Sequence, residues 1–449
     1  MWYNTVVNTY IMELIMFGFF KKQSPVRIIA LGFASLIFIG SLLLLLPISV
    51  RNGVELSYID SLYTSTSAVC VTGLVTVDAY DTFTPFGQAV LGILMQVGGL
   101  GVTAVGAGFI MLVGKKMDLK GRNVIREAMN LDSGKGVVRF VRNVLFTTLI
   151  IELIGAVLSF FVFVRDYSVP RAIGISLFHS VAAFNNSGFD IFGGMQSLSS
   201  YKDHVFLNTV TSALIFLGGI GFLVIREVIA KGFRWKKLSM HSRVVLSFSA
   251  ILLVLGTFLL KLSEGDNITW LGAFFSSTSA RTAGFSTFSF GNFSNAGLII
   301  MMILMFIGAS PGSTGGGIKT STLFVILQGI KSSATNRSEK AFHYSIPRES
   351  FKKAAVILIL ALSIILFSSF FVAALEPEIS LRDIFFEMTS AFATVGLSTG
   401  ITPGLSVGAK IVSCAVMYIG RLGPLTVASL WYFSRGERVR FPEGNIAIG

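Results

Sequence analysis

Near its end the chain reads Ala391-Phe392-Ala393-Thr394-Val395-Gly396-Leu397, a run of small and hydroxyl residues that closes on one glycine and a large apolar residue. Three earlier stretches follow the same pattern: Ala68-Val69-Cys70-Val71-Thr72-Gly73-Leu74, Ala183-Phe184-Asn185-Asn186-Ser187-Gly188-Phe189 and Ser279-Ala280-Arg281-Thr282-Ala283-Gly284-Phe285. The copies recur at a spacing of roughly a hundred residues, which indicates four pseudo-equivalent units around one axis. Four glycine-containing loops around an axis are a natural lining for an ion-selective pore.

The composition around these loops is that of a membrane protein. Hydrophobic residues make up 53% of the 449 residues and charged residues only 13%, whereas roughly 25% of a soluble domain is charged. Apolar runs long enough to cross a bilayer, about 20 residues, recur at 28–48, 141–164, 205–225, 244–262 and 354–375. Because the runs do not alternate in polarity as barrel strands do, the sequence predicts a polytopic helical membrane protein.

The net charge of +13 is spread unevenly over the connections between the apolar runs. Lys and Arg gather in every second connection, at 21–27, 115–142, 226–243, 331–353 and 435–440. The positive-inside rule then places both termini and three loops in the cytoplasm of a multi-pass protein of the cell membrane. We therefore expect membrane lipids, and no nucleic acid, among the partners. The basic loop 113–139 suits either a docking protein or anionic lipid headgroups.

Each unit reads as a spanning helix, a half-length apolar segment, the glycine loop and a second spanning helix. The half-length segments at 59–68, 172–183, 270–279 and 381–392 are too short to cross and must re-enter where protein or water surrounds them. The sequence thus predicts an all-α, potassium-channel-like fold of four parallel repeats and eight transmembrane helices around a central pore. The expected boundaries are 1–23 for an interfacial or cytoplasmic N-terminal segment, 24–112 for repeat 1, 113–137 for a basic cytoplasmic loop, 138–231 for repeat 2, 242–332 for repeat 3, 350–436 for repeat 4 and 437–449 for a cytoplasmic tail.

The loops offer what a dehydrated cation needs, because stacked rings of backbone carbonyls replace its hydration shell. A glycine with φ > 0 helps successive carbonyls to face one axis without steric cost. The half-helix before each loop directs its negative C-terminal end to the same place. The hydroxyl residues Thr72, Ser187, Thr282 and Thr394 can form hydrogen bonds behind the loops. The expected ion-binding residues are Val71, Thr72, Gly73, Asn186, Ser187, Gly188, Thr282, Ala283, Gly284, Thr394, Val395 and Gly396.

A break interrupts the second helix of the third unit. Residues 308–317 hold five glycines and one proline, which cost about 1 and 3 kcal/mol each in a helix interior. Ile318 separates Gly317 from Lys319, so the stretch lacks the order of a phosphate loop, and we do not expect nucleotide binding there. The other second helices hold shorter glycine clusters at 98–101, 218–221 and 420–423, which suit either close helix packing or a break. The break predicts an intramembrane gate at 308–319, formed by Gly312, Ser313, Thr314, Gly315, Gly316, Gly317 and Lys319 with Arg421.

Charged residues within the apolar runs are candidates for function. Arg421 is expected to face the pore beside the break, to raise the barrier to cations and to bind loop groups such as those of Ser313 and Thr314. Arg281 is expected to point behind its loop, towards the half-helix end or an outer carboxylate, because a positive charge in the ion path would oppose conduction. The sequence leaves open the roles of Lys319, Glu152 and Lys410.

The four loops, Asn185-Asn186-Ser187-Gly188-Phe189-Asp190 and the run Ser310–Thr320 together resemble the Trk/Ktr/HKT superfamily of cation transporters. The chain is most similar to the Ktr-type membrane (pore) subunit of bacteria, over about residues 25–440. Thr394-Val395-Gly396-Leu397 is the loop most like a potassium-channel filter, and the other three are degenerate beyond the glycine. Because all four glycine positions are filled, the resemblance implies a preference for potassium over sodium.

The resemblance implies potassium uptake across the cell membrane, with stimulation by sodium and gating by the intramembrane loop. It also implies a homodimer with one pore per protomer, bound to a cytoplasmic ring of RCK/KTN-type regulatory subunits. Nucleotide would act on that partner, so we expect no cofactor on this chain.

Three other functions fit the sequence less well. A sodium-coupled solute symporter would need paired inverted repeats around a midplane site, whereas the four units here are parallel. An enzyme is not expected, because no acid/base pair, metal cluster or activated nucleophile stands out. A scaffold that does not conduct ions would have no need of four filled glycine positions.

Overall fold

In the computed structural model, residues 23–112, 119–129, 136–336 and 340–430 are described. The expected tail 437–449, nearly all of the N-terminal segment 1–23 and part of the loop 113–137 lie outside these ranges. The helices are α2 (Pro25–Leu44), α3 (Tyr58–Val69), α4 (Ala79–Thr82), α5 (Pro85–Leu100), α6 (Val102–Leu112), α7 (Leu119–Ala128), α8 (Val137–Phe163), α9 (Val169–Phe184), α10 (Val205–Gly219), α11 (Phe222–Lys231), α12 (Met240–Glu264), α13 (Trp270–Ser279), α14 (Asn295–Phe306), α15 (Thr320–Thr335), α16 (Arg348–Leu375), α17 (Leu381–Ala393), α18 (Val407–Leu422) and α19 (Pro424–Ser429). Short 3-10 turns are η1 (Ser199–Tyr201), η2 (Trp235–Lys237), η3 (Gly265–Asn267), η4 (Phe290–Asn292) and η5 (Thr402–Gly404), and the antiparallel pair is β1 (Lys340–Ala341) with β2 (Tyr344–Ser345).

Four of these helices, α2, α8, α12 and α16, are long and apolar enough to cross a bilayer alone. The pairs α5–α6 and α10–α11 would add two more spans, although they bend by 99° and 100°. Between four and six spans are therefore evident in the described part of the chain, by length and composition. The chain is a polytopic helical membrane protein.

The glycine clusters produce both close packing and a break. A Cβ atom at Gly98 or Gly218 would collide with the backbone carbonyl at the end of the half-helix beside it. Three residues later, Gly101 and Gly221 end α5 and begin α11 with φ of +87° and +92°. Such angles are open to glycine at no steric cost, so each second helix packs tightly against its half-helix and then turns away.

The four half-length segments form α3, α9, α13 and α17. Hydroxyl side chains cap the N-termini of three of them, because Ser57, Thr269 and Ser380 accept hydrogen bonds from backbone N–H groups at 3.1, 3.0 and 3.2 Å. Each half-helix packs against the long helix before it, in the pairs α2–α3, α8–α9, α12–α13 and α16–α17. The half-helices have polar N-terminal ends and fully buried C-terminal ends, so each one points its C-terminus into the core.

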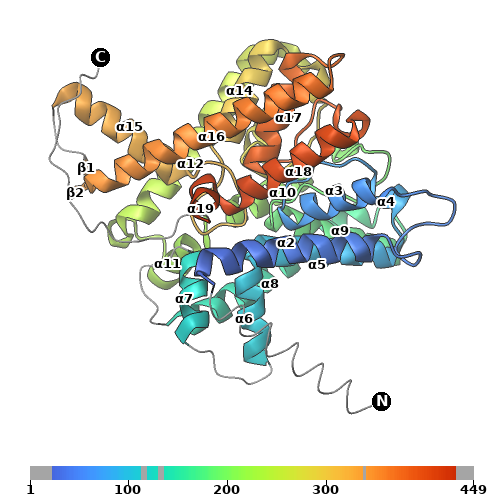
Figure 1. Ribbon diagram of the computed structural model, residues 1–449, viewed down its shortest axis with the longest axis horizontal. Coiled ribbons are helices and arrows are strands. Elements are labelled where there is room, and N and C mark those ends of the chain that lie inside the picture. The colour runs from blue at the N-terminus through green and yellow to red at the C-terminus, as the bar shows by residue number, and fades with distance from the viewer. Residues whose placement is uncertain (1–22, 113–118, 130–135, 337–339, 431–449) are drawn as a thin grey trace.

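The second helices join the units into a closed ring. α5 contacts α9, α10 contacts α13, α14 contacts α17, and α18 returns to contact α3. The last contact includes an ion pair between Lys410 Nζ and Asp60 Oδ1 at 2.8 Å, which links residues 350 positions apart. Figure 1 shows the red helix α18 beside the blue helix α3. The ring places the buried ends of the four half-helices around one centre.

Candidate functional site: a ring of four loops

The four glycine loops meet at that centre. Each glycine faces the backbone of a neighbouring loop so closely that an added Cβ atom would collide with it. The colliding pairs are Gly73 with Ser187 O, Gly188 with Ala283 O, Gly284 with Val395 O, and Gly396 with Thr72 O. These pairs run in cyclic order and return to the first loop. The structure thus brings together all twelve expected ion-binding residues, and all of them are buried except Gly396, which is half-buried.

Each loop has two residues with positive φ, separated by one residue. The pairs are Val71 and Gly73 (+55° and +93°), Asn186 and Gly188 (+58° and +68°), Thr282 and Gly284 (+72° and +83°), and Thr394 and Gly396 (+50° and +94°). The residue between each pair does not have a positive φ, and such an alternation of handedness turns successive carbonyls to the same side of the chain, which is the arrangement that a carbonyl-lined filter requires. The non-glycine member is costly, by roughly 1–2 kcal/mol for a residue with a Cβ atom. The sequence pattern points to the glycine alone.

Serine hydroxyls in the half-helices support two of the loops. The Gly73 N–H donates to Ser67 Oγ at 3.0 Å, and the Gly396 N–H donates to Ser390 Oγ at 3.1 Å. Both serines precede the loop glycine by six residues, and this repeated spacing was a signal that the sequence reading missed. The expected role of the loop hydroxyls is wrong for Thr72 and Thr394, whose Oγ1 atoms have no hydrogen-bond partner among the described residues.

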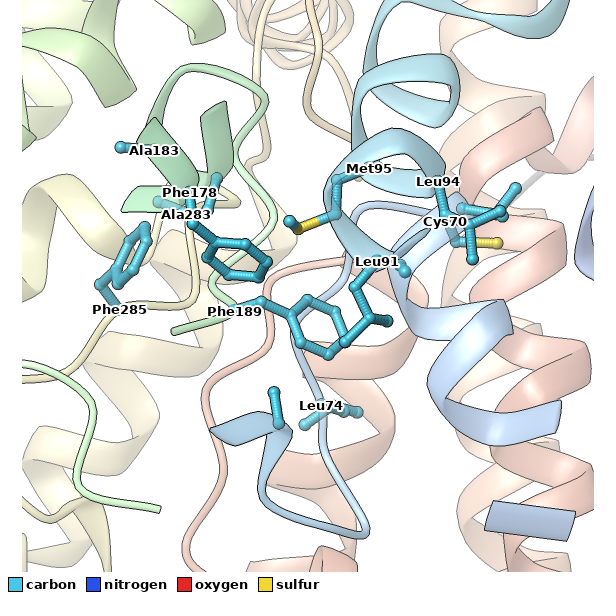
Figure 2. Packing of buried hydrophobic residues seen from close by; sticks show 14 of the residues in the cluster. Cys70, Leu74, Leu91, Leu94, Met95, Phe178, Ala183, Phe189, Ala283 and Phe285 are labelled. Atoms are coloured by element: carbon cyan, nitrogen blue, oxygen red, sulfur yellow. The ribbon is translucent and has the colours of Figure 1, made fainter. Parts of the chain in front are cut away.

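Apolar side chains fix the loops from behind. The residue after each loop glycine is a buried Leu or Phe, and three of these, Leu74, Phe189 and Phe285, belong to the largest apolar cluster. Figure 2 shows them with Leu91 and Met95, which come from the adjoining helix α5. Because interiors of this kind are close-packed, a loop cannot shift without displacing these side chains.

A cavity of about 260 Å³, here called the vestibule, opens on one side of the ring and is lined by all four loop glycines and by Asp78 and Asp190. Asp78 caps α4 and also accepts a hydrogen bond from Met195 N, so both of its oxygens are engaged. Asp190 accepts one hydrogen bond, from Phe192 N at 3.1 Å. Burial, with a smaller contribution from the Asp78 charge, raises the pKa of Asp190 to about 7, although the bond from Phe192 opposes the shift. Asp190 therefore carries a titratable negative charge at the mouth of the ring.

The break at 307–319 lies on the other side of the ring. An added Cβ atom at Gly315 would collide with the hydroxyl of Thr282, and one at Gly316 with the hydroxyl of Thr394. The break therefore touches the third and fourth loops on the side away from the vestibule. Thr314 Oγ1 donates to the carbonyl of Phe184, at the end of α9, at 3.2 Å. Because two glycines and a short hydroxyl residue line the contact, the break closely covers this side of the ring.

Two cations hold the break in place. Lys319 Nζ donates to Gly315 O at 2.7 Å and to Gly316 O at 3.3 Å, which closes the break on itself. Arg421 in α18 donates to the carbonyl of Thr314 and to the carbonyls of Gly98 and Gly99 in α5. The Ser313 hydroxyl donates within the break, to Ser310 O at 2.6 Å.

A second cavity of about 350 Å³ lies beyond the break and is lined by Arg421, Lys319 and the start of α2. The other end of α2 leads to Arg51, whose Nε atom donates to the carbonyl of Tyr80 next to the vestibule residues. The two cavities therefore open at opposite ends of the ring, with the break between them.

Three further buried polar side chains, Arg281, His179 and Glu152, have hydrogen-bond partners in the surrounding helices or at a helix end. Arg281 turns behind its loop and donates to Ser249 O and Oγ in α12, at 3.3 and 3.0 Å, and it pairs with no carboxylate among the residues that the structure describes. His179 shares a hydrogen bond of 2.9 Å with Thr211 Oγ1. Glu152 contacts Asn185 in the second loop. None of these side chains obstructs the ring.

Comparisons with known proteins show the family of the chain and its overall fold. The family model described as TrkH, cation transport protein, matches residues 20–263 and 248–433. The potassium/sodium uptake protein NtpJ of Enterococcus hirae is 37% identical over 445 residues, covering 96% of this chain and 98% of that protein. The Ktr system potassium uptake protein B of Bacillus subtilis is 35% identical over 442 residues, covering 95% and 97%.

The solved structure of the potassium transporter TrkH from Vibrio parahaemolyticus has the same fold, with a TM-score of 0.72 at 18% identity over 92% of this chain and 86% of that one. Family model and curated relatives extend over nearly the whole chain. The chain belongs to the TrkH family of cation transport proteins and is a transporter, not an enzyme.

Proposed function

We propose that this protein takes up potassium ions across the cell membrane through the ring of four loops, which acts as the selectivity filter. The observation that carries the proposal is the closed ring in which every loop has the same alternation of positive φ. Stacked carbonyls in such a ring substitute for the hydration shell of a potassium ion. Relatives with 35% and 37% identity bear the names of potassium uptake proteins, which supports the same cargo here.

The ion enters at the vestibule, passes the ring and leaves through the second cavity. The twelve residues of the filter are Val71, Thr72, Gly73, Asn186, Ser187, Gly188, Thr282, Ala283, Gly284, Thr394, Val395 and Gly396. The break forms the gate beneath them, because it lies between the ring and the second cavity. Lys319 and Arg421 hold the gate shut by binding its carbonyls, and their positive charges oppose a cation at that point.

The proposed assembly rests on the parallel repeats and on the likeness to Ktr-type potassium uptake proteins. Four parallel repeats with eight spans surround the pore, and the basic connections place both termini in the cytoplasm. The protein forms a homodimer with one pore per protomer, and a cytoplasmic nucleotide-binding ring regulates the gate. Sodium stimulates uptake. The closed contact cycle among α3, α9, α13 and α17 and the second helices supports the parallel repeats.

Potassium uptake is expected to fall on acidification around neutral pH. The pKa of Asp190 lies near 7, so acid neutralises the carboxylate and removes the charge that concentrates cations in the vestibule. Uptake measured from about pH 8 to about pH 6 should decline in the wild type. The Asp190→Asn variant should be slow and insensitive to pH over the same range. A variant that keeps the wild-type pH profile would exclude Asp190 as the titrating group.

Growth of cells that lack their own potassium uptake tests the proposed function. Expression of the full chain should restore growth at low potassium and uptake of potassium. If the chain reaches the membrane without restoring growth, co-expression with a cytoplasmic regulatory subunit should restore it. Failure in both cases would contradict the proposal and favour a sodium-coupled solute symporter, which sodium-driven uptake of other solutes would then reveal.

A further inference from the structure

Glu152 is an intramembrane carboxyl group that the proposed ion path does not use. It lies near the middle of α8 and is 6% exposed. No ion pair joins it to a Lys or Arg in the parts of the chain that the structure describes. Because a carboxyl group is costly at this depth, it is expected to have specific partners and a function.

Its partners form a triangle of side chains. Glu152 Oε2 accepts a hydrogen bond from Gln96 Nε2 in α5 at 3.2 Å, and Glu152 Oε1 accepts one from Asn185 Nδ2 at 3.0 Å. Asn185 Nδ2 also donates to Gln96 Oε1 at 2.7 Å. We call Gln96, Glu152 and Asn185 the amide clamp. Each side of the triangle joins a different pair among α5, α8 and the end of α9.

The clamp fixes Asn185 through its amide nitrogen. Asn185 Oδ1 lies against Gly99, where a Cβ atom would collide with it, and has no hydrogen-bond partner in the described ranges. Besides the clamp, the amide donates within the described ranges only to Val181 O, one turn back in α9, at 2.9 Å, so its two hydrogens serve three acceptors. The contacts that tie Asn185 to other helices by hydrogen bonds are therefore those with Gln96 and Glu152.

Asn185 in turn sets the start of the second loop. It is the C-cap of α9 and precedes Asn186, whose φ of +58° begins the alternation of that loop. The loop then contacts both of its neighbours. An added Cβ atom at Gly73 would collide with Ser187 O, and an added Cβ atom at Gly188 would lie 2.8 Å from Ala283 O. A shift of Asn185 would therefore move carbonyls on two sides of the ring.

We propose that Glu152 is a positioning residue for the selectivity filter: with Gln96 it holds Asn185, and so keeps the carbonyls of the second loop in register with those of the first and third. The proposal rests on the filter function proposed above. The clamp also adjoins the gate, because Gly98 and Gly99, just after Gln96, accept hydrogen bonds from Arg421. Selectivity, rather than folding, is the property that the clamp controls.

The test exchanges the two acid and amide side chains. Glu152→Gln keeps the size of the side chain but replaces one carboxylate oxygen with an NH2 group. This group then faces the NH2 group of Gln96 or of Asn185, which donates a hydrogen bond to Glu152 in the wild type. The potassium-to-sodium uptake ratio should fall about tenfold, the size expected for one lost hydrogen bond of a buried group. Gln96→Glu should also lower the ratio, because it brings a second carboxyl group beside Glu152. The double variant Gln96→Glu with Glu152→Gln can rebuild the triangle in mirror order and should restore the ratio.

Uptake of both ions is measured in cells without their own potassium uptake, with the membrane amount of each variant determined in parallel. Glu264→Gln is the matched control, because Glu264 is a buried carboxyl group whose hydrogen bonds in the described residues come from Ser294, the N-cap of α14, and not from a loop residue. It should leave the ratio unchanged. A non-selective wild type would overturn the proposed filter itself.

With a selective wild type, an unchanged ratio in Glu152→Gln would overturn the clamp. So would a double variant that reaches the membrane and remains unselective. Should the single variants fail to reach the membrane, the double variant decides alone: a wild-type ratio supports the clamp and a lowered ratio overturns it.

Discussion

Replacing Gly284 with serine should abolish selective potassium uptake. The φ of +83° at Gly284 is strained for any residue with a Cβ atom, and that atom would collide with the carbonyl of Val395 in the next loop and lie 3.0 Å from Gly188 Cα. The third loop must therefore withdraw from both neighbours, and the ring loses its shape. We expect the potassium-to-sodium uptake ratio to fall at least tenfold, equivalent to about 1.4 kcal/mol of discrimination.

Gly174→Ser provides the matched control for this change. Gly174 lies in the half-helix α9, an added Cβ atom meets nothing within 4 Å, and its φ is not positive. That variant should transport like the wild type. If Gly284→Ser reaches the membrane and retains wild-type selectivity, the glycine ring is not the filter.

Removing Arg421 should open the gate. Its guanidinium joins the break to α5 through the carbonyls of Thr314, Gly98 and Gly99, and each hydrogen bond to a charged group contributes about 1.5–3 kcal/mol. Arg421→Ala releases these bonds, and water in the second cavity can take their place. Potassium flux in the absence of any regulatory subunit should rise about tenfold or more, because even one such bond shifts an equilibrium by that amount.

A lysine at the same position separates the two effects of the arginine. Arg421→Lys keeps the positive charge but cannot reach Thr314 and α5 with a planar, forked group. Its flux should lie between those of the wild type and the alanine variant if the hydrogen bonds hold the gate. A flux equal to the wild type in Arg421→Ala, at normal membrane expression, would remove Arg421 from the gate.

The loops can be predicted from the sequence because a few neighbouring residues identify each of them. A small-residue run that ends in glycine and a large apolar residue, repeated four times after a short apolar segment, needs no knowledge of distant contacts. The same holds for the break, where five glycines and a proline exclude a continuous helix. The glycine clusters at 98–101 and 218–221 are also visible in the sequence, but the sequence does not decide between close packing and a break.

Other parts of the site depend on contacts that the chain order hides. Arg421 meets Gly98 across 323 residues, and no local pattern indicates this pairing. Val71 and Thr394 adopt positive φ although β-branched residues disfavour it. The surrounding packing imposes that conformation, so intrinsic preference predicts the opposite. Glu152 was visible as an intramembrane charge, but its role appears only once α5, α8 and α9 lie together.

The closed ring is made from one polypeptide, and this has a consequence for its evolution. In a pore built from four identical subunits, one altered codon changes every quarter of the filter at once. Here a substitution changes only one of the four loops, so the loops can diverge and take on different roles. The second has Asn185 and the third has Arg281 at the place where the first and fourth have Cys70 and Ala393. Selection can thus change the ion selectivity by altering one loop at a time.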